Sequence, residues 1–174
     1  MALVVFLKGI NVGGYRRARP TELAKKLRRY DAVSIGAAGT IVVRKSVSQA
    51  KLRVELRRLL PFETEVMICK GNEILRLAAS DPFRNESADR TIIQFVSVLG
   101  RRTRPAPPLP HVLPADGEWG LKILKHDRRF VLGVHRRQMK AIGYLGQLEK
   151  IFGTTATTRS WSTIQSVAKI LENA

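Results

Sequence analysis

The order of hydrophobic patterns in the first 70 residues most constrains the fold of this chain. Two segments with helical spacing of apolar residues, 21–30 and 48–60, lie among shorter apolar runs, and Thr21 and Ser48 are placed to cap the two helices. The order β-α-β-β-α-β is typical of a ferredoxin-like unit, in which both helices cover one face of an antiparallel sheet. The four expected strands are residues 3–7, 33–36, 39–44 and 64–69.

The rest of the chain predicts a second, smaller α+β unit. Five prolines within residues 101–114 indicate a loop or an extended arm, and residues 125–127 indicate the turn of a hairpin. Ser162 and Gln165 are spaced as a capping box for a last helix. We therefore expect tandem ferredoxin-like or related α/β-sandwich units with antiparallel sheets, an α+β fold. The expected units are residues 1–88 and 89–174.

Charge is the second strong feature of the sequence. Thirty-one Lys and Arg against fourteen Asp and Glu give a formal net charge of +17. Residues 15–60 hold thirteen basic and three acidic side chains, and residues 100–140 hold ten and three. Such clustering indicates a polyanionic partner, whereas the ordinary alternative is a solvated helix face.

Basic residues lie off the apolar stripes of both expected helices of the first unit. Because the expected fold packs these helices side by side, their basic sides are expected to merge into one surface that contacts a polyanion. The segment GTIVVRK lacks the aromatic residues of an RNA-recognition motif, so contact with the phosphate backbone is the more consistent version. The expected contact residues are Lys25, Lys26, Arg28, Arg29, Lys51, Arg53, Arg57 and Arg58.

A glycine-rich loop follows the first strand. Its G-x-x-x-x-G spacing fits a phosphate loop, but Tyr15 and Arg16 stand where that motif needs Lys and then Ser or Thr, so a magnesium-nucleotide loop is excluded. Two hypotheses stay open: a backbone nest that binds a simple anion, or a structural turn. The residues of the anion hypothesis are Gly9, Asn11, Gly13, Gly14, Arg16 and Arg17.

The segment TTATTRSW before the last helix offers a second group of candidates. Thr158, Arg159 and Trp161 have the chemistry to bind an anion or a nucleotide near a helix N-terminus. The alternative is structural, with Trp161 packing the helix onto a sheet.

Two motifs, FLKGINVGG (residues 6–14) and LEKIFGTTATTRSW (residues 148–161), together with the order of elements between them, resemble a bacterial family of unassigned function, the domain of unknown function 1697 family. The resemblance spans nearly the whole chain and implies two α+β units in tandem, but it implies no catalytic residue, substrate or cofactor. Relatives typically carry Ser-Gly-Asn before the third strand, where this chain has Ala38-Gly39-Thr40.

Other functional classes receive little support from the sequence. The three histidines lack the spacing of metal ligands, and Cys69, the single cysteine, lies in an apolar run, so neither a metal site nor a cofactor is expected. We find no catalytic signature and lean against an enzyme. The sequence has no segment typical of a secretory signal or a membrane helix, and with one cysteine it favours the cytoplasm.

We therefore expect a non-catalytic cytoplasmic protein that binds nucleic acid or another polyanion. The alternative is an enzyme or sensor that holds a small phosphorylated ligand between the GINVGG loop and the TTRSW segment. An acidic protein partner is a third possibility.

Overall fold

A computed structural model describes residues 1–86, 88–100 and 104–174. The chain divides into two compact units, one formed by Met1–Ser80 with Ser162–Ala174 and the other by Asp81–Trp161. The expected division was residues 1–88 and 89–174, with the last helix in the second unit. In the structure this helix groups with the first unit, and a side chain added at Gly71 would meet Leu171 at 3.0 Å.

The first unit contains a four-stranded antiparallel sheet in the order β2-β3-β1-β4. The strands are β1 (Leu3–Leu7), β2 (Ala32–Ile35), β3 (Thr40–Val43) and β4 (Val66–Lys70). The central strand β1 pairs with β3 on one side and with β4 on the other. This is the strand order of a split β-α-β-β-α-β unit, and it confirms the ferredoxin-like expectation for this part of the chain.

Two helices and a short 3-10 turn complete the pattern. They are α1 (Pro20–Lys26), η1 (Arg28–Tyr30) and α2 (Gln49–Leu59). The Ser48 side chain caps α2 as expected, because its oxygen accepts a hydrogen bond from the backbone N–H of Lys51 at 3.2 Å. The expected cap at Thr21 is wrong. α1 begins at Pro20, a residue that favours the first helical position, so Thr21 lies inside the helix and Arg19 is at its N-cap.

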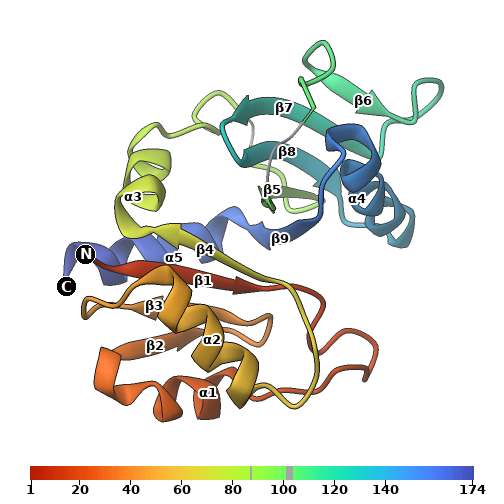
Figure 1. Cartoon of the computed structure of the whole chain (residues 1–174). Coiled ribbons are helices and arrows are strands. Elements are labelled where there is room, and N and C mark those ends of the chain that lie inside the picture. The colour runs from red at the N-terminus through yellow and green to blue at the C-terminus, as the bar shows by residue number, and fades with distance from the viewer. Residues whose placement is uncertain (87, 101–103) are drawn as a thin grey trace. The chain divides into compact units, whose positions relative to one another are not determined.

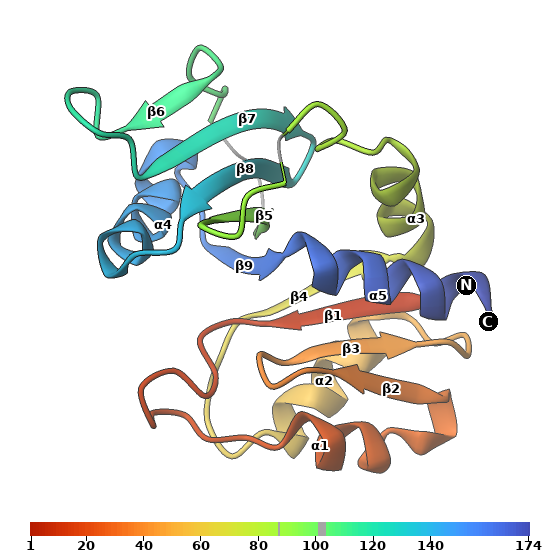
Figure 2. The ribbon, with the colours of Figure 1, turned by 180° about the vertical axis from the view of Figure 1, so that it is seen from behind.

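Alternate residues of β1 face two different cores. Leu3, Val5 and Leu7 pack in one buried cluster with leucines of α1 and α2, including Leu23 and Leu52. The intervening residues of β1 are also fully buried, so both faces of the sheet are covered. Figures 1 and 2 show α5 (Trp161–Glu172) on the face opposite to α2, and α3 (Gly71–Ala79) directly follows β4.

The second unit is built on a five-stranded antiparallel sheet in the order β6-β7-β8-β5-β9. Its strands are β5 (Ile92–Leu99), β6 (His111–Leu113), β7 (Leu121–Asp127), β8 (Phe130–Arg136) and β9 (Ala156–Ser160). The two antiparallel sheets with their helices confirm the α+β class. The order of elements in this unit differs from that of the first, since four strands precede its helix.

That helix, α4 (Met139–Phe152), packs its Leu148 and Phe152 in a core with residues of β5, β7 and β8. Gly133 on β8 is required by this packing. A Cβ atom there would lie 2.1 Å from the backbone oxygen of Lys122 and 2.7 Å from the ring of Phe95.

Three local expectations for the second half of the chain differ from the structure. The segment 101–114 was expected to lack regular structure, but β6 (His111–Leu113) lies within it. Residues 101–103 of this segment lie outside the described residues. The hairpin turn is at Arg128-Arg129 rather than at 125–127, because Asp127 already pairs with Phe130. α5 begins at Trp161, which places Ser162 inside the helix rather than at its cap.

Within residues 1–86, 88–100 and 104–174, no helix has the length and apolar character needed to cross a membrane.

Candidate functional site

The glycine loop forms a small hairpin. Val12 and Tyr15 pair as an isolated antiparallel bridge, and the backbone N–H of Tyr15 donates to the oxygen of Val12 at 3.0 Å. The two residues between them, Gly13 and Gly14, both have positive φ, at 58° and 78°. Positive φ at both central residues defines a type I′ turn, for which Gly-Gly is a favoured sequence. The turn therefore accounts for these two glycines without any ligand.

Asn11 anchors this hairpin to the rest of the first unit. Its side-chain nitrogen donates to the backbone oxygens of Ala18 and Ala37, both at 2.8 Å, and its side-chain oxygen accepts from the N–H of Ala18 at 3.0 Å. The residue itself has a φ of 57°, a conformation that Asn tolerates better than most residues. The amide of Asn11 is thus occupied in fixing the loop to the turn between β2 and β3.

The same turn contains the triplet Ala38-Gly39-Thr40. Gly39 has a φ of 83°, and a Cβ atom there would lie 2.7 Å from the Cβ of Leu7. The central glycine of the triplet is therefore fixed by geometry and packing.

Three side chains leave the hairpin toward solvent. Arg16 and Arg17 are exposed, as expected for an anion site, and Tyr15 is 80% exposed. Tyr15 was not among the residues expected to bind an anion. Its exposure could have been predicted from its neighbours in sequence, Gly13-Gly14 and Arg16-Arg17, because neither pair offers an apolar side chain to cover the ring.

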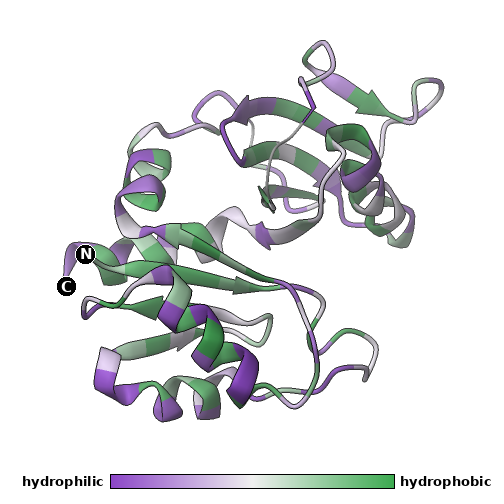
Figure 3. Cartoon of the chain, viewed as in Figure 1, coloured by the Kyte–Doolittle hydropathy of each residue, from purple (hydrophilic) through white to green (hydrophobic). Residues whose placement is uncertain are grey.

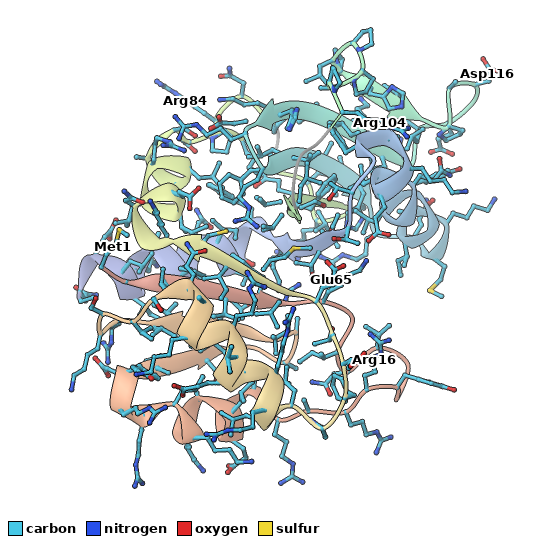
Figure 4. All side chains as sticks on the ribbon, in the orientation of Figure 1. Met1, Arg16, Glu65, Arg84, Arg104 and Asp116 are labelled. Atoms are coloured by element: carbon cyan, nitrogen blue, oxygen red, sulfur yellow. The ribbon has the colours of Figure 1, made fainter. Side chains whose placement is uncertain are left out.

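A cleft of about 730 Å³ links the hairpin to the second helix of the same unit. Arg16 from the hairpin and Arg57 from α2 both line it, so the structure brings together one residue from each set of candidates. Phe62 contributes an aromatic wall, while Glu63 and Glu65 contribute carboxylates. Figure 4 marks Arg16 and Glu65. The cleft is therefore mixed in charge and within the size range of small-ligand sites.

Three of the expected contact residues have partners within the protein. Lys25 forms an ion pair with Glu22 at 2.7 Å, and Arg29 pairs with Glu55. Arg53 is half-buried, and its guanidinium donates to the backbone oxygen of Val66 on β4. These three cations are engaged within the protein.

The other five cations on α1, η1 and α2 are exposed and, within the described part of the chain, have no side-chain hydrogen bond or ion pair. Figure 3 shows hydrophilic residues on the outer sides of α1 and α2, with hydrophobic residues along the sheet beneath. We call this set the basic face. It consists of Lys26, Arg28, Lys51, Arg57 and Arg58.

A buried carboxylate holds the two helical segments together under the basic face. The Tyr30 hydroxyl donates to Glu55 Oε1 at 2.5 Å, and the Arg29 guanidinium pairs with the same oxygen. The hydrogen bond from Arg29, followed by that from Tyr30, lowers the pKa of Glu55 below its ordinary value of 4.5. The Glu55 carboxylate therefore serves as a structural contact, and the residue is only 9% exposed.

The TTRSW candidates belong to the second unit, where β9 forms instead of a loop. Thr158 Oγ1 lies 2.5 Å from the hydroxyl oxygen of Ser97, and the Trp161 ring packs edge-on against Phe83 with centroids 5.2 Å apart. Arg159 is 6% exposed and donates to Thr157 Oγ1 at 2.8 Å. Burial lowers the pKa of Arg159 to about 10, so the guanidinium is still charged at neutral pH.

The side chains that most often bind metal ions are those of His, Cys, Asp and Glu. No group of three or more such residues is arranged to hold a metal ion in the described segments. Cys69 is buried in β4.

A family model described as a protein of unknown function (DUF1697) matches residues 1–107 of the chain. The match covers more than half of the sequence and includes the FLKGINVGG motif, whereas LEKIFGTTATTRSW follows the matched residues. Comparison with curated proteins and with solved structures gives no significant match.

Proposed function

The chain belongs to the DUF1697 family of proteins of unknown function, and we propose that it binds the phosphate backbone of nucleic acid through the basic face. The observation that carries this proposal is that five cations on α1, η1 and α2 are exposed and, in the described chain, have no side-chain hydrogen bond or ion pair. A solvated helix face normally intersperses acids among its bases. Here Glu22 and Glu55 form their ion pairs with Lys25 and Arg29, which are not part of the basic face.

The expected binding mode is electrostatic and has little dependence on sequence. Each Lys or Arg that neutralises a phosphate releases counterions, so affinity falls as salt rises. Backbone contacts fix register and orientation but do not identify bases. A reducing compartment such as the cytoplasm, where nucleic acid is present, also suits a chain whose single cysteine is buried.

The proposal is tested by binding of a labelled single-stranded oligonucleotide across a salt series. We expect measurable binding at roughly 50 mM salt, with a log–log slope of about −0.7 for each phosphate contact. The triple variant Arg28→Ala, Arg57→Ala, Arg58→Ala should bind more weakly and with a shallower slope. A matched variant that removes three exposed cations of the second unit is Arg84→Ala, Lys140→Ala, Lys150→Ala.

The matched variant carries the same net charge as the triple variant, so any difference between the two reports position rather than total charge. Equal losses in both would mean that binding follows net charge alone and would contradict an interface at the basic face. Absence of binding by the wild-type protein at low salt would remove the proposal altogether.

A second candidate function rests on the cleft between Arg16 and Arg57. Two guanidinium groups beside an aromatic residue and carboxylates suit a small phosphorylated ligand whose hydroxyl or amino groups reach Glu63 or Glu65. This keeps the ligand class of the alternative hypothesis and uses residues of the first unit. A ligand found in a panel of nucleotides and sugar phosphates should raise the melting temperature of the wild-type protein. At 100 times its Kd, such a ligand adds about 2.7 kcal/mol to the free energy of unfolding. Loss of that shift in Arg57→Ala, but not in Lys140→Ala, would support it.

A further inference from the structure

Tyr15 is the most exposed aromatic residue in the described part of the chain. Its ring is 80% exposed, and Val12, its partner in the hairpin bridge, is 66% exposed. An aromatic ring combines a large apolar area with a flat π-face, which another planar group can cover. The hairpin therefore presents an apolar tip on an otherwise basic segment.

The hairpin is also held in place before any ligand binds. The type I′ turn fixes Val12 opposite Tyr15, the N–H of Asn11 donates to the oxygen of Arg16 at 3.1 Å, and Asn11 ties the base of the hairpin to Ala37. A preorganised segment loses less conformational entropy on binding than a mobile loop. A ring carried on it can therefore contribute more of its contact energy to affinity.

Charge around Tyr15 continues toward the basic face. Arg16 and Arg17 directly follow it, and Arg16 lines the same cleft as Arg57, which belongs to the basic face. A strand of nucleic acid whose phosphates contact Arg57 can thus meet Arg16 within the same unit. The aromatic ring is adjacent in sequence to that contact.

We infer that Tyr15 stacks on an unpaired base of single-stranded nucleic acid while the basic face binds the phosphates. Stacking on aromatic side chains is tolerant of sequence because every base has a π-face. Bases inside a duplex already stack on one another, so the ring has no free base to cover. This inference rests on the proposed function and adds to it a preference for single strands.

The experiment compares three probes of equal length: a single-stranded oligoadenylate, a single strand made of abasic sites, and a duplex. Tyr15→Ala should bind the oligoadenylate at least about fivefold more weakly than the wild type, as expected for loss of one stacked base. Its affinity for the abasic strand and the duplex should be unchanged. Tyr15→Phe should retain binding, because the ring is kept. Met139→Ala removes an apolar side chain that is 84% exposed in the second unit, and it serves as the matched control.

The outcomes separate this inference from the proposed function. If the wild type binds all three probes equally, or if Tyr15→Ala binds oligoadenylate as the wild type does, Tyr15 does not stack and backbone binding stands alone. If the wild type binds none of the probes, both proposals fail. Because Tyr15 is exposed, Tyr15→Ala should unfold at the wild-type temperature, and a circular dichroism melt checks that the loss is not one of folding.

Discussion

The Tyr30 hydroxyl donates a hydrogen bond to Glu55 Oε1 across 2.5 Å, and this contact joins η1 to the middle of α2. The ion pair of the same carboxylate with Arg29 makes Glu55 the acceptor for two neighbouring residues. Glu55 therefore links η1 to α2 through two contacts, in addition to the buried cluster that Tyr30 shares with Leu52 and Leu56 of α2.

Replacement of Glu55 by Gln should lower the free energy of unfolding at pH 7 by about 1–3 kcal/mol, because the amide oxygen lacks the negative charge that strengthens the hydrogen bonds from Tyr30 and Arg29. The folded-state pKa of Glu55 lies below its ordinary value of 4.5. Its stabilisation is therefore fully present above about pH 4.5 and is lost as pH falls through the lower folded-state pKa.

Urea unfolding of wild type and Glu55→Gln at pH 7 and at successively lower pH measures this. The two curves should converge in acid. Glu22→Gln, which alters an exposed pair with Lys25, is the control and should leave the unfolding midpoint unchanged at either pH. A gap between wild type and Glu55→Gln that stays constant down to strong acid would contradict the assignment.

Arg53 and Arg58 should separate stability from binding. Arg53 donates to the backbone oxygen of Val66, so Arg53→Ala should destabilise the protein by about 1–3 kcal/mol without changing the salt dependence of nucleic-acid binding. Arg58 is exposed, so Arg58→Ala should leave the stability of the protein unchanged and should make the salt dependence of nucleic-acid binding shallower. Thermal melts and the salt series are run on both variants, and a shared phenotype would show that the two arginines act together.

Asn11→Ala should loosen the hairpin. The variant loses three hydrogen bonds and places alanine at a φ of 57°, so we expect a loss of about 1–3 kcal/mol in stability. Amide hydrogen exchange at Ala18 should accelerate, because its N–H donates to the Asn11 side chain. Slow exchange in the variant would mean that the loop is fixed by other contacts.

Two glycines of the second unit predict opposite effects of the same substitution. Gly133→Ala places a Cβ 2.1 Å from a backbone oxygen and should destabilise by about 1–3 kcal/mol or more. Gly146→Ala adds a methyl group in open space on α4 and should stabilise by about 0.8–1 kcal/mol, because alanine favours the helix. Chemical denaturation of both variants measures the two signs.

The first sheet was predictable because its strands and helices are marked by local apolar patterns. Leu3, Val5 and Leu7 form a continuous run, and Leu52 and Leu56 repeat at helical spacing. β9 was missed because Thr157 and Thr158 give a polar segment whose strand conformation depends on pairing with β5, a partner about sixty residues away in sequence. β6 was missed for a similar reason, since three residues pair with β7 between prolines.

The sequence predicts which residues of the candidate site are basic, but it does not predict which of them have partners within the protein. The sequence identifies Arg29 and Arg53 as basic, yet whether each meets solvent or a partner depends on the distance to Glu55 and to the backbone of Val66. The role of Asn11 likewise depends on Ala37, which approaches only when β2 and β3 form their hairpin. Tertiary contacts, rather than residue type, decide which charges remain available.

The grouping of Ser162–Ala174 with Met1–Ser80 has a consequence for synthesis on the ribosome. One face of the first sheet is covered by α5, whose Ile164 and Val167 are fully buried, and α5 is translated after the whole second unit. Until then the nascent first unit exposes a hydrophobic sheet face while the whole second unit emerges. The first unit is therefore completed only after the second unit has been synthesised, and the second unit is able to finish folding before it.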